Sequence, residues 1–194
     1  MNIVVAGVGG QGAVLFSNIL SEMALTAGLD VKKSEVHGMA QRGGSVTTHV
    51  RYAPKVYSPM VEEGTADLLV AFERLEALRY VHLLSKTGRL VYDPYRLDPL
   101  PVKLGMVERP EDARIDERVA ARAPERLAVP AFDIALELGE PRVQNVVMLG
   151  AVSRFLDFSQ PAYQDAIKSL VKPRFVELNL RAFERGVSLA RATA

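Results

Sequence analysis

The glycine-rich stretch "GVGGQG" near the N-terminus constrains the fold of this chain more than any other feature. It follows a short apolar run, residues 2–6, and precedes residues 13–27, in which apolar side chains recur at four-residue steps. Gly28 then stands where a left-handed residue commonly ends a helix. The pattern predicts a strand, a tight turn and a helix. A second strand over residues 29–36 would complete a parallel βαβ unit.

Further strands and helices follow along the chain. Residues 66–73 form a continuous apolar run typical of a strand buried on both faces, and residues 88–94 predict the next strand. Residues 45–52 alternate, which predicts a half-exposed strand. One face of that strand would carry Val46, Thr48, Val50 and Tyr52, and the other Ser45, Thr47, His49 and Arg51. The helix after residue 73 would place Ala77, Val81 and Leu84 on one face.

The C-terminal half is predicted to be mostly helical. Residues 108–126 carry both charge signs, as a solvated helix or excursion does, and residues 126–139 predict a strand and a helix that stops at Gly139. From Asn145 onward every segment has a helical pattern, beginning with a helix that is apolar nearly all round. The last helix, residues 175–190, carries two apolar stripes, and the second stripe predicts a partner surface.

These segments predict one α/β domain over residues 1–194. Its core would be a doubly wound, mainly parallel Rossmann-like sheet, with helices added at the C-terminus.

Composition excludes several classes of function. The formal net charge is +1, so we expect neither a nucleic-acid nor a membrane partner. The sequence contains no cysteine, so this chain cannot hold an iron–sulfur cluster through thiolates or form a disulfide. The N-terminus has neither the basic start nor the apolar run of a signal peptide, and we expect a cytoplasmic location.

The glycine turn by itself leaves several functions open. Its GxGxxG spacing between a strand and a helix suits a dinucleotide, because backbone amides at a helix start can hold a phosphate. A NAD site also needs an acidic residue at the end of the second strand; Glu35 could serve, although Lys32 and Lys33 precede it. The doubled glycine is also found in ATP-binding turns of adenylating enzymes. The simplest alternative is a tight turn with no ligand.

The three histidines are far apart in the sequence, and no metal-binding spacing is present. His82 is expected to be a surface residue, and His49 to share a solvated or interface face with Arg51. His37 lies within the glycine-rich segment 35–46, "EVHGMAQRGGSV", where a functional role is plausible.

Five sequence blocks together resemble one family. "GVGGQG", "SEVHGMAQRGGSV", "ADLLVAFERLEALR", "NVVMLGA" and "VELNLRAFERG" stand in the order found in the gamma-type subunits or domains of 2-oxoacid:ferredoxin oxidoreductases. The block "HGMAQRGG" is most similar to the indolepyruvate, or aryl-pyruvate, branch, in which the corresponding chain is the beta subunit. Pyruvate, 2-oxoisovalerate and 2-oxoglutarate remain alternative substrates. A free-standing NAD- or ATP-binding protein and a ligand-free interaction module remain alternatives of other classes.

The resemblance implies oxidative decarboxylation of a 2-oxo acid in a hetero-oligomeric complex. Thiamine diphosphate with Mg²⁺, 4Fe-4S clusters that reduce ferredoxin, and CoA as the acyl acceptor are expected in that complex. This chain lacks the thiamine signature as well as cysteine, so we expect it to be inactive alone. The thiamine- and iron–sulfur-bearing alpha subunit is its expected partner.

The segment 35–46 would then follow a parallel strand, at the edge of the sheet where open α/β folds bind ligands. His37 and Arg42 are the catalytic candidates, and Arg42 would offer a planar cation to a carboxylate or phosphate. A simple joint between subunits is the alternative. The candidate cofactor-binding residues are Gly7, Gly9, Gly10, Gln11, Gly12, Glu35, Gly38, Met39, Gln41, Gly43 and Gly44.

Overall fold

A six-stranded sheet forms the centre of the computed structural model, which describes residues 1–37 and 43–192. The strand order is β2-β3-β1-β4-β5-β6. The strands are β1 (Asn2–Val8), β2 (Asp30–His37), β3 (Ser45–Ala53), β4 (Ala66–Ala71), β5 (Leu84–Tyr92) and β6 (Arg126–Ala128). β1, β4, β5 and β6 pair in parallel, whereas β3 runs antiparallel to both β1 and β2. The predicted mainly parallel α/β sheet is confirmed.

The position of β3 corrects one detail of that prediction. β1 and β2 run in the same direction, but β3 lies between them, so they do not form an adjacent parallel pair. His49, at the centre of β3, is opposite Val4 of β1 and Ser34 of β2.

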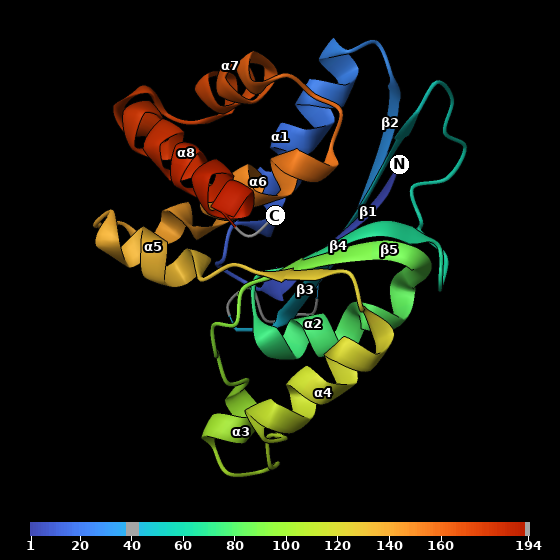
Figure 1. Ribbon diagram of the computed structural model, residues 1–194, viewed down its shortest axis with the longest axis vertical. Helices are drawn as coiled ribbons and strands as arrows, with labels where there is room; N and C mark the ends of the chain where they lie inside the picture. The colour runs from blue at the N-terminus through green and yellow to red at the C-terminus, as the bar shows by residue number, and fades with distance from the viewer. Residues whose placement is uncertain (38–42, 193–194) are drawn as a thin grey trace.

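Helices cover both faces of the sheet (Figure 1). One face carries α1 (Ala13–Thr26), α5 (Ala131–Glu137), α6 (Gln144–Val152), α7 (Gln160–Leu170) and α8 (Val176–Ala192). The other face carries α2 (Arg74–Tyr80), α3 (Leu100–Lys103) and α4 (Asp112–Arg122). Short 3-10 turns are η1 (Val81–Leu83), η2 (Pro141–Val143), η3 (Ser153–Phe155) and η4 (Pro173–Phe175).

β1 shows how the sequence builds two cores. Ile3 and Val5 belong to the core under α1 and α6, whereas Val4 and Ala6 belong to the core under α2 and α4. All four side chains are fully buried, because successive residues of a strand point to opposite faces and both faces are covered. Fully burying a valine or isoleucine side chain stabilises the folded state by about 1.5–3 kcal/mol.

The expectation of a half-exposed strand at residues 45–52 is wrong. Thr47, Thr48, His49 and Val50 are all buried, because β3 is an interior strand. His49 is therefore not on a solvated face: its Nδ1 accepts a hydrogen bond of 3.0 Å from the Val61 amide. Burial lowers the pKa of this imidazole.

Two helix predictions also change. Ala77, Val81 and Leu84 do not share one helix face as predicted. The helix α2 ends at Tyr80, Val81 begins the 3-10 turn η1, and Leu84 begins β5. The charged segment 108–126 is more than a solvated excursion, since Ile115 and Val119 of α4 are fully buried.

The buried helix predicted after Asn145 is confirmed as α6, and every residue in it is buried. It crosses α8 at a pair of glycines. A Cβ added to Gly150 would lie 2.1 Å from the Phe183 carbonyl oxygen, and one added to Gly186 would lie 2.0 Å from the Val147 carbonyl oxygen. Glycine is therefore required at both positions for the two backbones to touch.

Both predicted apolar stripes of α8 contribute to this chain's own core: Ala182 and Phe183 are buried, and four further members are partly buried, namely Leu178, Leu180, Val187 and Leu189. The partner surface on α8 stays a prediction. Within residues 1–37 and 43–192, no helix combines the length and apolar character that a membrane span requires.

Candidate functional site

The glycine turn after β1 meets the segment before β3 at the carboxyl edge of the sheet. The Gly9 amide donates to the Gly44 carbonyl oxygen at 2.8 Å, and the Gly43 amide donates to the Gly9 carbonyl oxygen at 3.4 Å. Two glycine-rich motifs that are distant in sequence are thus joined through their backbones. Open α/β sheets bind ligands at this edge, so the arrangement defines the candidate site.

Some of the predicted site residues lie outside the part of the chain that the structure describes. Gly38, Met39, Gln41 and Arg42 lie outside the described residues. His37 ends β2, where its backbone pairs with Val46.

The glycines of the turn differ in their surroundings. Gly10, with φ of 108°, has no heavy atom within 4 Å of the place a Cβ would occupy. Gly12, with φ of 83°, precedes α1 and is crowded: a Cβ there would lie 2.5 Å from Asn145 Nδ2. Gly10 therefore faces open space, whereas Gly12 permits close packing of the turn on α6.

Gln11 points back into the protein. Its Oε1 accepts a hydrogen bond of 2.7 Å from the Val8 amide, and its Nε2 donates to the Phe72 carbonyl oxygen at 2.9 Å. The side chain thus ties the end of β1 to the end of β4. Both of its polar groups are already used within the chain.

Glu35 is separated from the turn. It pairs with Thr48 in the β2–β3 ladder, so β3 stands between it and β1. Its carboxylate lies 2.7 Å from the Lys33 ammonium. The arrangement differs from a dinucleotide fold, in which the acidic strand is adjacent to the glycine-turn strand.

A buried polar chain continues from Gln11 along the carboxyl edge. Gln144 Nε2 donates to the Phe72 carbonyl oxygen at 2.9 Å and to Asp93 Oδ2 at 2.8 Å. Asp93 also accepts from the amides of Tyr95 at 2.9 Å and Phe132 at 2.7 Å. Burial raises the pKa of Asp93 to about 6, although these donors oppose the shift. The Asp93 carboxyl group therefore joins the end of β5 to the start of α5 and to α6, and Gln144 joins α6 to the end of β4.

The stretch that leads into β3 has a second anchor. Ser45 Oγ donates to the buried Glu76 carboxylate at 2.5 Å, and Thr47 Oγ1 lies 3.1 Å from the Tyr80 hydroxyl. These contacts fix residues 45–47 on α2.

Glu73 caps α2 at the same edge of the sheet. Its carboxylate accepts from the amides of Leu75 at 2.5 Å and Glu76 at 3.0 Å. Burial raises the pKa of Glu73, while its hydrogen bonds and the nearby Arg109 act in the opposite direction. Arg109 is itself buried and lies 3.6 Å from Glu73 and 3.2 Å from Asp98. These pairs hold the segment between β5 and α4 against α2.

The family follows from comparison with known proteins. Residues 2–189 match the family model described as pyruvate ferredoxin/flavodoxin oxidoreductase. The chain belongs to this family.

Two related subunits align with this chain over nearly its whole length. It is 39% identical to the indolepyruvate oxidoreductase subunit IorB of Thermococcus kodakarensis, covering 98% of this chain and 96% of that one. It is 38% identical to the IorB subunit of Archaeoglobus fulgidus, covering 98% and 95%. The crystal structure of a keto/oxoacid ferredoxin oxidoreductase gamma subunit from Geobacter sulfurreducens superposes with a TM-score of 0.72 at 26% identity, covering 98% of both chains. The predicted membership of the gamma-type family is confirmed.

Sequence reasoning missed several buried polar residues of this family member. Asp93, Glu73, Gln144 and Asn145 are at most 2% exposed. The available signal was position: Asp93 directly follows β5, Glu73 comes two residues after the end of β4, and the Gln-Asn pair opens a helix that is otherwise apolar.

Asn145 Nδ2 donates to the Gly12 carbonyl oxygen at 3.2 Å, and its Oδ1 is a buried acceptor with no partner among the described residues. His49 is buried in β3 and His82 is exposed, and no cluster of three or more metal-ligating side chains occurs in the described part of the chain.

Proposed function

We propose that this chain is the non-cluster subunit of a 2-oxoacid:ferredoxin oxidoreductase whose substrate is indolepyruvate or another aryl pyruvate. The observation that carries the proposal is the 38–39% identity to indolepyruvate oxidoreductase subunits over nearly the full length of both chains. The complete absence of cysteine supports the assignment of the clusters to another subunit.

The glycine turn offers a limited site for an anionic cofactor group. The amides of Gly9 and Gln11 are used by the carbonyl oxygens of Gly44 and Val8. The Gly10 amide has no hydrogen-bond partner among the described residues, and the space beside Gly10 is open. A phosphate of CoA or thiamine diphosphate would therefore be held by the Gly10 amide and the first amides of α1.

The chain's own part in the reaction is to shape and close this edge of the active site. In the complete enzyme, thiamine diphosphate with Mg²⁺ would supply the electron sink for decarboxylation, 4Fe-4S clusters a route to ferredoxin, and CoA the acyl acceptor. Gln11, Gly44 and Ser45 would hold the two glycine motifs in fixed positions. Arg42, on the segment between β2 and β3, would then bind a carboxylate or phosphate across the subunit interface.

Reconstitution tests the proposal. The purified chain should show no iron–sulfur absorption and no 2-oxo acid oxidation alone, and it should restore indolepyruvate-dependent ferredoxin reduction when it is mixed with the cluster-bearing subunit. A substrate panel with pyruvate, 2-oxoisovalerate and 2-oxoglutarate identifies the branch. Oxidation of indolepyruvate by the isolated chain, or a complex that prefers 2-oxoglutarate, would contradict the assignment.

Arg42 provides the sharpest variant for this assay. Truncating a buried charged donor costs about 2–5 kcal/mol at an interface, so Arg42→Ala should fold normally alone yet strongly reduce activity of the complex. Arg42→Lys should also perform poorly, because an ammonium lacks the two-pronged donor geometry of a guanidinium. Arg114→Ala, on the exposed surface of α4, is the matched control. Normal turnover and partner affinity in both Arg42 variants would leave the segment as a surface loop.

A further inference from the structure

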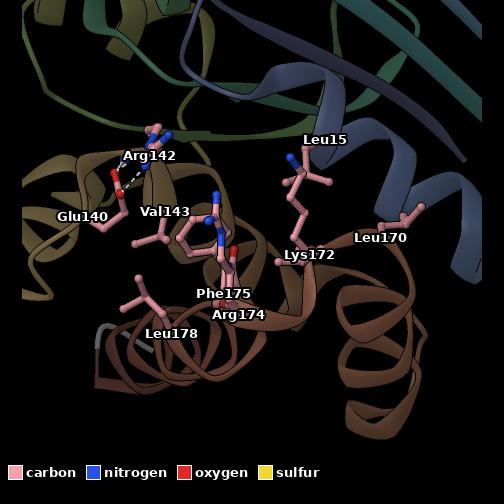
Figure 2. Close-up of a pocket in the computed structure, with 11 residues that line it drawn as sticks. Leu15, Glu140, Arg142, Val143, Leu170, Lys172, Arg174, Phe175 and Leu178 are labelled. Atoms are coloured by element: carbon pink, nitrogen blue, oxygen red, sulfur yellow. Dashed lines mark hydrogen bonds and ion pairs between the residues drawn. The ribbon is translucent and has the colours of Figure 1, made fainter.

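A separate cavity of about 350 Å³ lies between α1, the α5–α6 connection and the α7–α8 connection. Figure 2 shows its basic side chains, Arg142, Lys172 and Arg174, with Lys172 extending toward Leu15 of α1. The volume is in the range of small-molecule sites. Nothing in the proposed reaction uses this cavity.

The charges of the cavity are not balanced within the protein. Among the described residues, Glu140 is the only acidic residue that lines it, and the Glu140 carboxylate pairs with the Arg142 guanidinium through contacts of 2.6 and 2.8 Å. Neither Lys172 nor Arg174 has an ion-pair partner among the described residues. Two cations that line one cavity without a counter-charge repel each other, and an anion bound between them would relieve the repulsion.

The aromatic ring of Phe175 contacts the two arginines of the cavity. The Arg174 guanidinium lies 4.7 Å from the ring centroid and the Arg142 guanidinium lies 5.9 Å from it. Such cation–π contacts restrict where a guanidinium can point, which leaves its N–H donors available to a ligand. The side-chain amide Nδ2 of Asn179 in turn donates to the Phe175 carbonyl oxygen at 2.8 Å.

The remaining lining is apolar. Leu15, Val143, Leu170, Val171 and Leu178 also contribute to the cavity. An inorganic anion would pair with the cations but leave this apolar surface exposed to water. A ligand with an apolar body would also cover the surface, which is favourable.

We propose that this cavity binds a small phosphate monoester with a compact apolar body, through Lys172 and Arg174. A phosphate monoester carries a charge of about −2 at neutral pH, which matches the two unpaired cations, whereas a carboxylate neutralises only one. The apolar part of the ligand lies on Leu15, Leu170 and Leu178. The inference is independent of the proposed reaction.

Calorimetry on the full chain tests this site with phenyl phosphate, inorganic phosphate and phenylacetate as probes. We expect phenyl phosphate to bind most tightly, because its dianion matches both cations while its ring covers the apolar wall; phenylacetate neutralises only one cation, and inorganic phosphate has no ring. The double variant Lys172→Gln with Arg174→Gln should weaken phenyl phosphate binding by about tenfold or more. Leu170→Ser, at a side chain that is 40% exposed, should weaken phenyl phosphate but not inorganic phosphate.

Lys168→Gln is the matched control, since it removes an exposed positive charge on α7 that does not line the cavity. The absence of saturable binding, or equal binding by the double variant, would overturn the proposal. Phenylacetate binding as tight as that of phenyl phosphate would overturn the choice of phosphate. An equal loss in Lys168→Gln would trace binding to net charge instead of this cavity. Retention of inorganic phosphate binding in the double variant would likewise overturn the proposal, because the phosphate would then bind outside this cavity.

Discussion

The carboxyl edge of the sheet and the cavity between α7 and α8 use polar side chains in opposite ways. At the edge, Gln11, Gln144 and Asp93 direct their polar atoms to other groups of the same chain. In the cavity, Lys172 and Arg174 have no such ion-pair partners in the described part of the chain. These three side chains at the edge therefore hold the fold, whereas Lys172 and Arg174 in the cavity are available to a ligand.

This contrast changes how the glycine motif is interpreted. Gln11 is the fifth of the six residues of "GVGGQG", where a ligand contact is expected, yet it joins β1 to β4. The part of the turn that remains accessible to a ligand is the backbone at Gly10. A motif can thus contain residues that shape a site beside residues that touch its ligand.

The largest expected effect comes from removing Asp93. Asp93→Ala leaves the amides of Tyr95 and Phe132 without their side-chain acceptor and removes one of the two acceptors of Gln144 Nε2. Each buried donor left unpaired costs about 1–3 kcal/mol, so we expect the free energy of unfolding to fall by about 3–5 kcal/mol in urea titrations. Asp133→Ala, on the exposed side of α5, should change it by less than about 0.5 kcal/mol. Equal effects in the two variants would mean that the buried chain is not a fold determinant.

The next effect separates two glycines of the same turn. Gly12→Ala introduces a side chain at positive φ and collides with Asn145, so we expect a loss of about 3 kcal/mol. Gly10→Ala meets only the backbone strain, about 1–2 kcal/mol, because the space beside it is open. Chemical denaturation of both variants measures the difference. A Gly10 variant that is at least as unstable as the Gly12 variant would contradict the packing on α6.

Stability should also depend on the protonation of Asp93. Its pKa in the folded protein is raised to about 6 by burial, against 3.8 as the ordinary value. The folded state therefore binds this proton more tightly, so the stabilising contribution is fully present below pH 3.8 and is lost as the pH rises to about 6. The loss amounts to at most about 3 kcal/mol.

Asp93→Asn should remove this component. Urea titrations from pH 4 to 7 give the difference in the free energy of unfolding between wild type and Asp93→Asn. That difference isolates the contribution of Asp93 from those of other titrating groups, including Glu73 and His49. A difference that stays constant over this range would assign the pH dependence to those groups.

The order of strands and helices was predictable because each element has a local period. The position of β3 was not, because strand pairing joins residues that are distant in sequence. The burial of His49 depends on residues 54–63 folding over β3, and the Val61 amide that it accepts from lies twelve residues further along the chain. The packing of α4 depends on Arg74 and Arg109, whose acidic partners come from several segments.

The candidate site divides in the same way. The importance of Gly12 could be read from its place between a strand and a helix, since that geometry is local. The positions of Asp93 and Gln144 beside apolar segments were a weaker signal, because a single polar residue beside an apolar run can face either solvent or the core. Only the meeting of β4, β5, α5 and α6 makes them neighbours.

The smallest expected effect concerns the cavity. Lys172 and Arg174 make no ion pair among the described residues, so replacing both with glutamine removes repulsion and only a cation–π contact worth about 0.5–1 kcal/mol at an exposed site. These contributions oppose each other, and we expect the free energy of unfolding to change by less than about 0.5 kcal/mol. The same variant should abolish any stabilisation that phenyl phosphate gives the wild type in thermal melts, because a ligand stabilises only the state that binds it. A large loss of stability without ligand would mean that these cations hold the fold, as the carboxyl edge does, and would remove the contrast between the two regions.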